Sequence, residues 1–406
     1  MGRGGGRVGR GAARRRATGA AQRYPVLGGA SRSAEGSHMA PSPFRRLTAR
    51  CAVPLGIFLL VLVAGCRTAR GPGGDAALDG AGEQGADAAA PAAAAATPAG
   101  AIDPEAGAFQ YPYPVSYFPL ISQRQQLRMA YIDAMPAAPN GRTVMLLHGK
   151  NFHAGTWATT IASLNRAGFR VIAPDQIGFG KSSKPERYQF SFTQLAANTR
   201  ALLVSLGISR SAVVGHSMGG MLAARYALDY PEATERLVLV NPIGLEDYAA
   251  LIPPRTVDDW YAQELKQNPE QVREYQRKAY YDGAWKPEYE EHTRLLAGWT
   301  LHPEWPRMAW ISALTYDMVF TQPIVPHLGR VRVPTLLVIG LRDRSAPGRP
   351  LAAPEVQKTM GDYTRLGKDT QRRIPGAALV ELPGVGHVPQ VEAFPAFEKA
   401  LLEFLR

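Results

Sequence analysis

The sequence predicts an α/β fold in which helices cover both faces of a mostly parallel sheet. Six short apolar runs lack the alternation of half-exposed strands, and turn residues bound them. Such runs are typical of strands that are buried on both faces. Stretches with helical spacing lie between several of them, and this order indicates parallel strands joined by helical crossovers. Residues 107–406 are numerous enough to build one large hydrophobic core.

The expected elements follow one another along the chain with recognisable ends. Leu195 and Leu202 fall on one face of the second helix, as burial of one side requires. Gly168 and Gly207 stand where helices end, and Pro231 cannot continue the third helix. Strands are expected at residues 128–135, 143–147, 170–173, 212–214, 236–240, 335–339 and 378–382, and helices at 156–167, 192–206 and 218–230.

Ligands of such sheets bind at the carboxyl ends of the strands. Polar and glycine-containing segments follow five of the expected strands, so the functional residues should come from these junctions. The junctions are residues 148–151, 175–180, 215–219, 241–244 and 340–343.

Residues 215–219 read Gly-His-Ser-Met-Gly, which is a G-x-S-x-G pattern. The pattern follows the apolar run 212–214 and opens the helix 218–230. A sharp strand-to-helix turn should therefore expose the hydroxyl of Ser217. Side chains at positions 215 and 219 would collide with neighbouring chain, and Gly220 lets the helix pack close to the sheet. Ser217 is the candidate nucleophile.

A serine hydroxyl needs a base, and the base needs an acid that orients it. His387 lies in a loop directly after the last expected strand and is the candidate base. Asp343 follows another strand end and is the candidate acid. Asp175 precedes the serine in the chain and is expected to be structural, while Glu246 and Asp247 are the reserve acids.

Acyl transfer also requires donors for the oxyanion that develops on the attacked carbonyl. The backbone N–H of Met218, the residue after the nucleophile, is expected to be one donor. The backbone N–H of Lys150 is expected to be the second, with Asn151 as the next candidate. The Lys150 ammonium group has two interpretations: it attracts an anionic substrate group, or it is a solvated loop lysine.

Four segments at or near strand ends, residues 148–152, 175–182, 215–219 and 384–387, are similar to motifs of one family. Through them the chain resembles the α/β-hydrolase superfamily over residues 115–406. The resemblance is closest to the branch that holds C–C bond hydrolases, proline-iminopeptidase-like enzymes, small-molecule esterases and cofactor-free haloperoxidases. It implies an eight-stranded sheet and the chain order Ser217, Asp343, His387 for the triad. Epoxide hydrolases and haloalkane dehalogenases share the branch, but their nucleophile is an aspartate. The segments are His-Gly-Lys-Asn-Phe at 148–152, Asp-Gln-Ile-Gly-Phe-Gly-Lys-Ser at 175–182, the turn at 215–219 and Gly-Val-Gly-His at 384–387.

Residues 244–332 lack the strand pattern and are rich in tryptophan and tyrosine. The resemblance implies a helical cap over the serine at this place. Its aromatic side chains either line an apolar pocket or form the core of the cap itself, and the second interpretation is favoured. About 43 residues separate Asp343 from His387, with a polar helical stretch near 359–373. This spacing departs from the usual pattern of the family.

The net charge of +12 belongs to the beginning of the chain. The first 70 residues hold 13 basic residues and one acidic residue, and the remainder holds 33 of each. A nucleic-acid-binding module needs a basic face on a folded domain, so the balance counts against nucleic acid as a partner. Both cysteines, Cys51 and Cys66, also precede residue 70, which excludes a disulfide framework and a cysteine zinc site in the remainder.

Residues 39–66 are similar to a bacterial lipoprotein signal. Basic residues precede a short apolar segment, 52–64, that is too short to span a membrane, and Leu-Val-Ala-Gly-Cys ends it at Cys66. The resemblance implies that Cys66 is lipidated and anchors the protein in a bacterial cell envelope, on the outer-membrane or periplasmic side. The alternative is a signal peptide or anchor that happens to end in cysteine.

The flanking segments have no pattern of a folded domain. Residues 1–38 are rich in Gly, Arg and Ala, and either form a disordered tail or precede a true start at Met39, which is the favoured interpretation. Residues 67–106 are rich in Ala, Gly and Pro and are expected to tether the folded domain, 107–406, to the membrane.

The sequence thus predicts a lipid-anchored serine hydrolase whose partners are a small-molecule acyl substrate and a lipid membrane. An ester or related acyl compound is the expected substrate, and the chemistry requires no metal ion or organic cofactor. The first alternative is a C–C bond hydrolase on the same triad. The second is a non-catalytic binding protein on the same fold.

Overall fold

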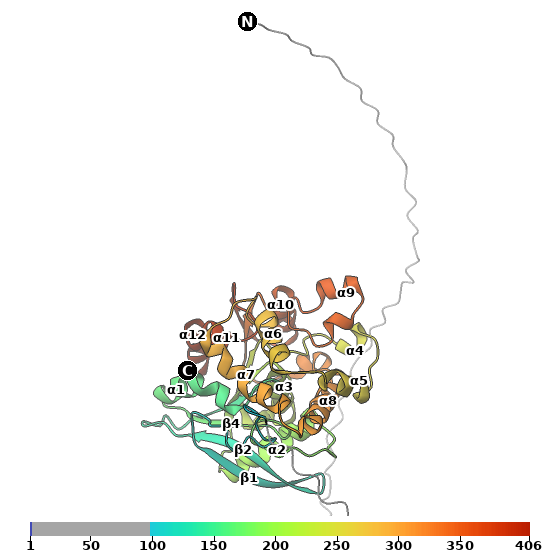
Figure 1. The fold of residues 1–406 in the computed structure, drawn as a ribbon. Coiled ribbons are helices and arrows are strands. Elements are labelled where there is room, and N and C mark those ends of the chain that lie inside the picture. Colours follow the sequence, from blue (N-terminus) through green and yellow to red (C-terminus); the bar gives the residue numbers. More distant parts are fainter. Residues whose placement is uncertain (2–97) are drawn as a thin grey trace, which may run out of the picture. The chain divides into compact units, whose positions relative to one another are not determined.

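The computed structural model describes Met1 and residues 98–406 (Figure 1). The expected leader, the signal segment with Cys66 and the tether as far as residue 97 lie outside the described residues, apart from Met1. The last part of the expected tether packs on the folded domain. Ala106 is buried, and its carbonyl accepts a hydrogen bond from the Lys181 ammonium group. The indole of Trp299 donates to the carbonyl of Asp103 at 3.0 Å. The folded domain therefore begins a few residues before position 107.

Eight strands form one sheet in the order β1-β2-β4-β3-β5-β6-β7-β8. β1 and β2 pair antiparallel, as do β2 and β4, and all other neighbours are parallel. The eight-stranded, mostly parallel sheet is confirmed. The strands are β1(Val115–Ser122), β2(Gln125–Ala134), β3(Thr143–Leu147), β4(Arg170–Pro174), β5(Ser211–His216), β6(Thr234–Val240), β7(Thr335–Gly340) and β8(Ala378–Leu382).

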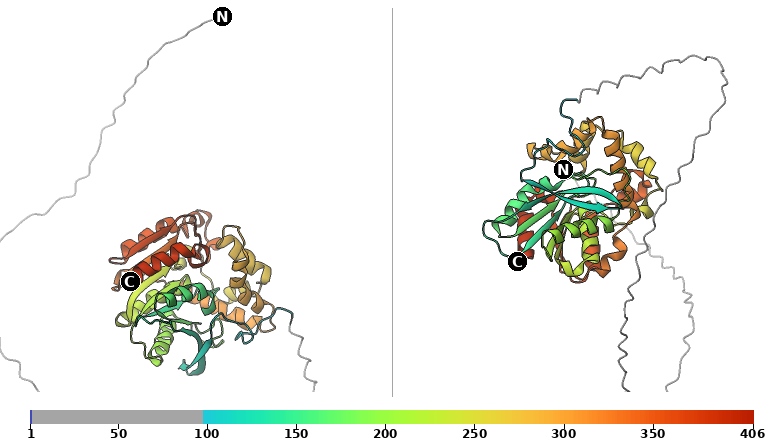
Figure 2. Two further views of the ribbon diagram at one scale, coloured as in Figure 1. Left: turned by 90° about the vertical axis from the view of Figure 1, so that its left-hand side faces the viewer. Right: turned by 90° about the horizontal axis from the view of Figure 1, so that it is seen from below.

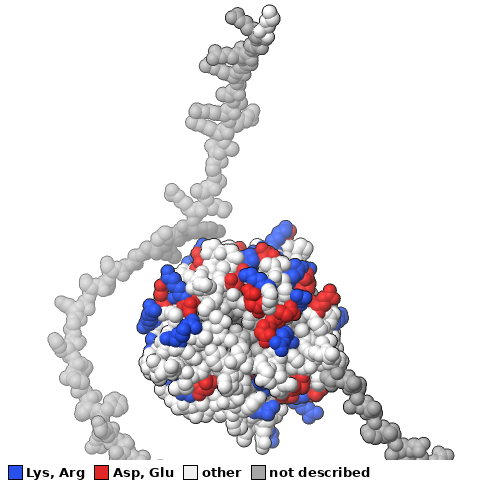
Figure 3. All heavy atoms as spheres, turned by 60° about the vertical axis from the view of Figure 1, so that its left-hand side comes forward, with Lys and Arg blue, Asp and Glu red and all other residues white. Residues whose placement is uncertain are grey.

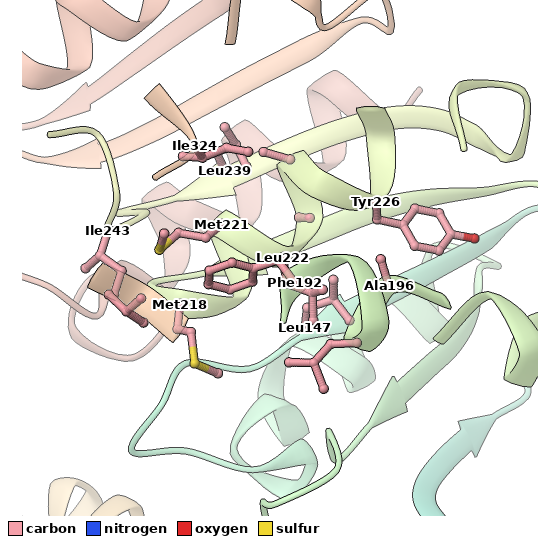
Figure 4. Packing of buried hydrophobic residues seen from close by; sticks show 14 of the residues in the cluster. Leu147, Phe192, Ala196, Met218, Met221, Leu222, Tyr226, Leu239, Ile243 and Ile324 are labelled. Carbon is pink, nitrogen blue, oxygen red and sulfur yellow. The ribbon is translucent and has the colours of Figure 1, made fainter. Parts of the chain in front are cut away.

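Helices cover both faces of the sheet (Figure 2). Successive residues of β3 show how: Val144 and Leu146 pack into a cluster with α1(Ala158–Arg166) and α12(Phe394–Leu405), whereas Met145 and Leu147 pack into the cluster of the opposite face. That second cluster includes residues of α2(Phe192–Ser205), α3(Met218–Asp229) and α10(Tyr363–Arg373), and Figure 4 shows part of it around Leu222. Strands buried on both faces explain why their sequences are continuously apolar.

Two expected helices differ from the observed ones. The helix expected at 156–167 divides into a 3₁₀ turn, η1(Ala154–Trp157), and α1. The polar stretch near 359–373 contains α10, which is the crossover helix between β7 and β8. Tyr363 and Leu366 of α10 are buried against the sheet, so its polar face is the solvent side of an ordinary amphipathic helix.

The cap lies between β6 and β7, as expected, and its helices appear gold and orange in Figure 1. The favoured interpretation of its aromatic residues holds for Tyr281 and Tyr289, which stack in a buried cluster. Trp299 and Trp305 belong to another buried cluster and also line a cavity under the cap, so both interpretations apply to them. The cap helices are α4(Tyr248–Leu251), α5(Val257–Glu264), α6(Pro269–Ala279), α7(Pro287–Thr300) and α8(Trp305–Thr321), followed by η3(Val325–Arg330).

The remaining elements are short and connect the core. They are η2(Pro231–Ala233), η4(Arg349–Leu351), α9(Pro354–Thr359) and α11(Pro389–Glu392). In the part of the chain that the structure describes, no helix combines the length and hydrophobicity that crossing a bilayer requires. On the face in Figure 3, Lys and Arg side chains lie interspersed with Asp and Glu side chains, which agrees with the balanced charge of the chain after residue 70.

Candidate active site

Ser217 occupies the sharp turn between β5 and α3. Its φ is 56° and its ψ is −121°, a conformation that is strained for an L-residue. This tight turn is possible because residues 215 and 219, on either side of it, are glycines. A Cβ on Gly215 would lie 2.1 Å from the carbonyl oxygen of Gly219, and a Cβ on Gly219 would lie 2.2 Å from the carbonyl oxygen of Leu147. The structure therefore has the strand–turn–helix geometry that the G-x-S-x-G pattern predicts.

The structure brings Ser217, Asp343 and His387 together. Nε2 of His387 is 2.9 Å from the Ser217 hydroxyl, and Nδ1 of His387 is 2.7 Å from Oδ2 of Asp343. The three residues are only 6%, 0% and 1% exposed, respectively. With the proton on Nδ1, the imidazole donates to the carboxylate and accepts from the hydroxyl. This tautomer leaves Nε2 free to take the serine proton.

Asp343 is held by two further donors. The side-chain amide of Asn241 donates to Oδ2 at 2.8 Å, and the N–H of Ser345 donates to Oδ1 at 2.7 Å. Oδ1 of Asn241 in turn accepts from the N–H of Gly340 at 2.8 Å. The sequence marked 241–244 as a junction, but it did not indicate that Asn241 orients the acid. That role depends on β6 lying beside β7, which becomes visible only in the folded sheet.

Asp175 and Glu246, two other carboxylates that the sequence brought into consideration, have contacts outside the triad. Asp175 is buried and accepts hydrogen bonds from the Tyr111 hydroxyl and from the N–H groups of Ala154 and Lys181, so it braces loops, as expected. Glu246 accepts from the N–H of Gly361 and pairs with an arginine of α10. Among residues 98–406, Asp343 is the carboxylate that contacts His387.

Two neighbouring histidines brace the site without touching the serine hydroxyl. His148 bridges the carbonyl of Gly149 and the N–H of Gln176. Nε2 of His216 is 2.8 Å from the carbonyl oxygen of His387 and donates to it, which fixes the backbone of the candidate base. Burial lowers the pKa of His148 and holds the pKa of His216 well below its usual value, so both rings stay neutral.

The two expected oxyanion donors lie close to Ser217. The N–H of Met218 belongs to the first turn of α3, where an N–H has no acceptor inside the helix. The N–H of Lys150 donates to no acceptor among the described residues. The preceding residue lies close to the nucleophile, because a Cβ built on Gly149 would lie 3.0 Å from Cβ of Ser217. Neither amide donates to another group among the described residues, as an oxyanion donor requires.

The Lys150 side chain lies under the cap, so the interpretation as a solvated loop lysine is wrong. Only 12% of the side chain is exposed, and its ammonium group donates to the hydroxyl of Ser312. Tyr280, a cap residue, covers the base: its ring stacks on His387, and its hydroxyl accepts a hydrogen bond of 3.0 Å from the Asn151 side chain. Neither contact follows from sequence spacing, because cap and core residues are far apart along the chain.

Two hollows adjoin these residues. A narrow cavity under the cap has an apolar wall and a polar end formed by Lys150, Asn151, Glu264, Ser312 and Thr315. Its apolar wall includes Phe179, Leu296, Trp299, Trp305, Met308 and Ile311. A more open groove of about 350 Å³ lies beyond Tyr275 and Tyr280 and is lined by the arginines at 342, 344 and 349. Within the described residues, no cluster of three or more His, Cys, Asp or Glu side chains is arranged to hold a metal ion.

This fold and this site define a class of protein. Residues 142–394 match the alpha/beta hydrolase fold family, and the chain belongs to it.

The chain is similar to individual proteins over different shares of their length. A probable hydrolytic enzyme from Pseudomonas aeruginosa PAO1, known from a crystal structure, is 54% identical, with a TM-score of 0.74 over 75% of this chain and 98% of that one. An uncharacterised protein of Mycobacterium tuberculosis is 39% identical over 115 residues, which is 28% of this chain and only 33% of that protein. A 2-hydroxy-6-oxo-6-phenylhexa-2,4-dienoate hydrolase of Burkholderia cepacia is 28% identical over 66% of this chain and 89% of its own length.

Proposed function

We propose that the protein is a serine hydrolase that cleaves an ester or a related acyl compound of modest size. The observation that carries the proposal is the unbroken chain of contacts from the Ser217 hydroxyl through His387 to Asp343, at 2.9 and 2.7 Å. A nucleophile, a base and an orienting acid in this order meet the geometric requirement for nucleophilic acyl transfer.

The proposed reaction has two halves. The Ser217 hydroxyl attacks the carbonyl carbon while Nε2 of His387 takes its proton, and the carbonyl π electrons move to the oxygen. The N–H groups of Met218 and Lys150 stabilise this oxyanion. The intermediate collapses, the ester C–O bond breaks, and His387 returns the proton to the leaving alcohol. Water then attacks the acyl-serine by the same route, which releases the acid and restores the hydroxyl.

The site also supports this chemistry through its surroundings. Asp343 is buried and accepts from three donors, so it stays oriented toward the imidazole. The apolar wall of the cavity under the cap suits an apolar acyl or alcohol group, and Lys150, whose N–H is the expected second oxyanion donor, also lines this cavity.

The test is hydrolysis of p-nitrophenyl esters of increasing acyl length by the full chain and by Ser217→Ala. We expect turnover by the wild type and a loss of at least about a thousandfold in the variant, since the triad acts as a unit. A suitable matched control is Ser209→Ala, because Ser209 is exposed in the loop before β5. Equal turnover in wild type and Ser217→Ala would overturn the proposal.

A second candidate is hydrolysis of a C–C bond in a dienoic ketone by the same residues. It is favoured by the Burkholderia cepacia relative, whose name specifies a 2-hydroxy-6-oxo-dienoate and which aligns over most of its own length. Loss of dienoate absorbance with this chain, together with slower ester turnover, would favour this candidate. Inactivity on both substrate types and no labelling of Ser217 by a fluorophosphonate would leave a binding protein on the hydrolase fold.

We also propose that the protein is anchored in a bacterial cell envelope through lipidated Cys66, on the outer-membrane or periplasmic side. The proposal is supported by the basic, apolar and Leu-Val-Ala-Gly-Cys parts of residues 39–66, in that order. Two acyl chains hold a protein stably in a bilayer, whereas one does not. Fatty-acid labelling and membrane partition should be lost in Cys66→Ser and retained in Cys51→Ser; retention in both would overturn the proposal.

A further inference from the structure

The segment that supplies the expected second oxyanion donor is fastened to the cap. Residues 149–151 follow β3 and belong to the core, but the side chains of Lys150 and Asn151 contact three segments of the cap. Lys150 contacts α5 and α8, and Asn151 contacts Tyr280, which follows α6. We call residues 149–151 the oxyanion loop.

The Lys150 contact is a buried ionic cluster. Its ammonium group donates to the Ser312 hydroxyl, lies 3.9 Å from Oε2 of Glu264, and sits 3.8 Å above the centre of the Tyr316 ring. The Ser312 hydroxyl donates to Glu264 at 2.5 Å, and the Gln267 amide donates to it at 3.0 Å. Glu264 is 2% exposed. One cation and one carboxylate therefore face each other in the buried interior of the cap.

Loss of either charge would leave the other one buried without a partner. Burial lowers the pKa of the Lys150 ammonium group, and the carboxylate of Glu264 raises it. Without Glu264 the ammonium group would be buried without an opposite charge, and this is strongly unfavourable. The side chain would then leave the cap or lose its proton, and the loop that carries it would no longer be held in one place.

We propose that Glu264 is a positioning residue that holds the oxyanion loop in place through Lys150, so that the second oxyanion donor is aligned only when the cap is closed on the core. The proposal rests on the proposed function, because alignment of this amide matters when an oxyanion forms. It assigns the cap a role in the chemical step in addition to its role as a cover.

The physical link is short. The backbone N–H of Lys150 and its ammonium group belong to one residue, so a tie on the side chain limits the rotation of the peptide plane. The Asn151–Tyr280 hydrogen bond, 3.0 Å long, limits the next residue. A misplacement of about 1 Å in a catalytic group costs about a hundredfold in rate.

The experiment compares Glu264→Gln with Glu291→Gln in the full chain. Glu291 pairs with Arg294 on the exposed side of α7 at 2.6 Å and serves as the matched control. We expect Glu264→Gln to lower kcat for a p-nitrophenyl ester by about ten- to a hundredfold while KM changes by less than about threefold, because a donor that acts in the transition state is lost. Glu291→Gln should behave like the wild type.

Two further measurements separate positioning from a merely structural role. The double variant Lys150→Met/Glu264→Gln should lose about as much kcat as either single variant, because both substitutions remove the same interaction between Lys150 and Glu264. Hydrogen–deuterium exchange should be faster in the peptide spanning residues 149–153 of Glu264→Gln, and unchanged in Glu291→Gln.

The possible results are distinct. Unchanged kcat and unchanged exchange in Glu264→Gln would overturn the inference, as would a raised KM with unchanged kcat. If the wild type hydrolyses no ester, the proposed function fails, and faster exchange in Glu264→Gln would still support the tie between cap and loop. If Glu264→Gln does not fold, Lys150→Met decides by the same two readouts.

Discussion

The ring of Tyr280 lies stacked on the imidazole of His387, with ring centroids 4.7 Å apart and planes inclined by 28°. Tyr280 belongs to the cap and His387 to the loop after β8, so the stack is a contact between the two parts of the domain. Arg342 reinforces it, since its guanidinium group contacts Glu392 and lies 3.4 Å from the carbonyl of Tyr280. The candidate base is therefore covered by an aromatic ring that is itself held in place.

Removal of this ring should slow the reaction. We expect Tyr280→Ala to lower kcat/KM for esters by about tenfold, because a stacked aromatic pair contributes about 0.5–1.5 kcal/mol and water would enter over His387. Tyr280→Phe keeps the stack and should retain most activity. Tyr117→Ala, on the edge strand β1, is the control. Wild-type rates in Tyr280→Ala would show that the stack has no part in the reaction.

The amide of Asn241 should contribute to both stability and activity. In Asn241→Ala, Asp343 loses one of its donors and the N–H of Gly340 loses its bond to Oδ1. An unsatisfied buried polar group costs about 1–3 kcal/mol. We expect a decrease of this size in the free energy of unfolding by urea, and a fall in kcat with little change in KM.

Asn140 offers the comparison, since its exposed side chain also bonds to backbone. Asn140→Ala should leave kcat unchanged. A loss of stability without any loss of kcat in Asn241→Ala would show that Asp343 needs no support from β6.

Lys184 should make stability depend on pH above neutrality. Its buried ammonium group donates to the carbonyls of Phe179, Gly180 and Ser182, and burial lowers its pKa from 10.5 to about 7. Between these two values the unfolded chain binds a proton that the folded chain does not. The contribution of Lys184 to stability therefore rises as pH increases from about 7 toward 10 and falls as pH is lowered.

Urea unfolding at pH 7, 8 and 9 measures this effect. The free energy of unfolding should increase less steeply with pH in Lys184→Met than in the wild type, and by at most about 1.4 kcal/mol per pH unit less. Lys278→Met removes an exposed lysine on α6 and should keep the wild-type slope. Equal slopes in all three proteins would show that Lys184 stays protonated throughout this range.

Local sequence predicted the parts of the fold that depend on local signals. Strands buried on both faces have continuous apolar runs, so the range expected for β3 agrees with the observed one. The range expected for β8 also agrees, although β8 is an edge strand and only partly buried. In the edge strand β1, Pro119 interrupts the apolar residues, as is tolerated at an edge, and half of the residues face solvent. No apolar run marked this strand, although the family resemblance implied an eighth one.

Local sequence signals likewise predicted some residues of the site, whereas others depend on contacts between distant segments. The turn around Ser217 and the loops of Asp343 and His387 stand at strand ends, where the topology rule directs attention. Asn241, Glu264 and Tyr280 were not singled out as site residues, because each acts through a neighbour that is distant in the chain. Lys150 was selected for its backbone, and its buried side chain became apparent only with the cap in place.

The most direct test of the central claim is to locate the adduct that a fluorophosphonate forms with the full chain. Peptide mass spectrometry should find the phosphonyl group on Ser217, and the labelling rate should fall sharply in His387→Gln, because the base activates the hydroxyl. His302→Gln, a histidine of the loop before α8, is the control. Labelling at Ser217 that depends on His387 is the predicted result. Absence of labelling at Ser217 in a protein that hydrolyses esters would contradict the account.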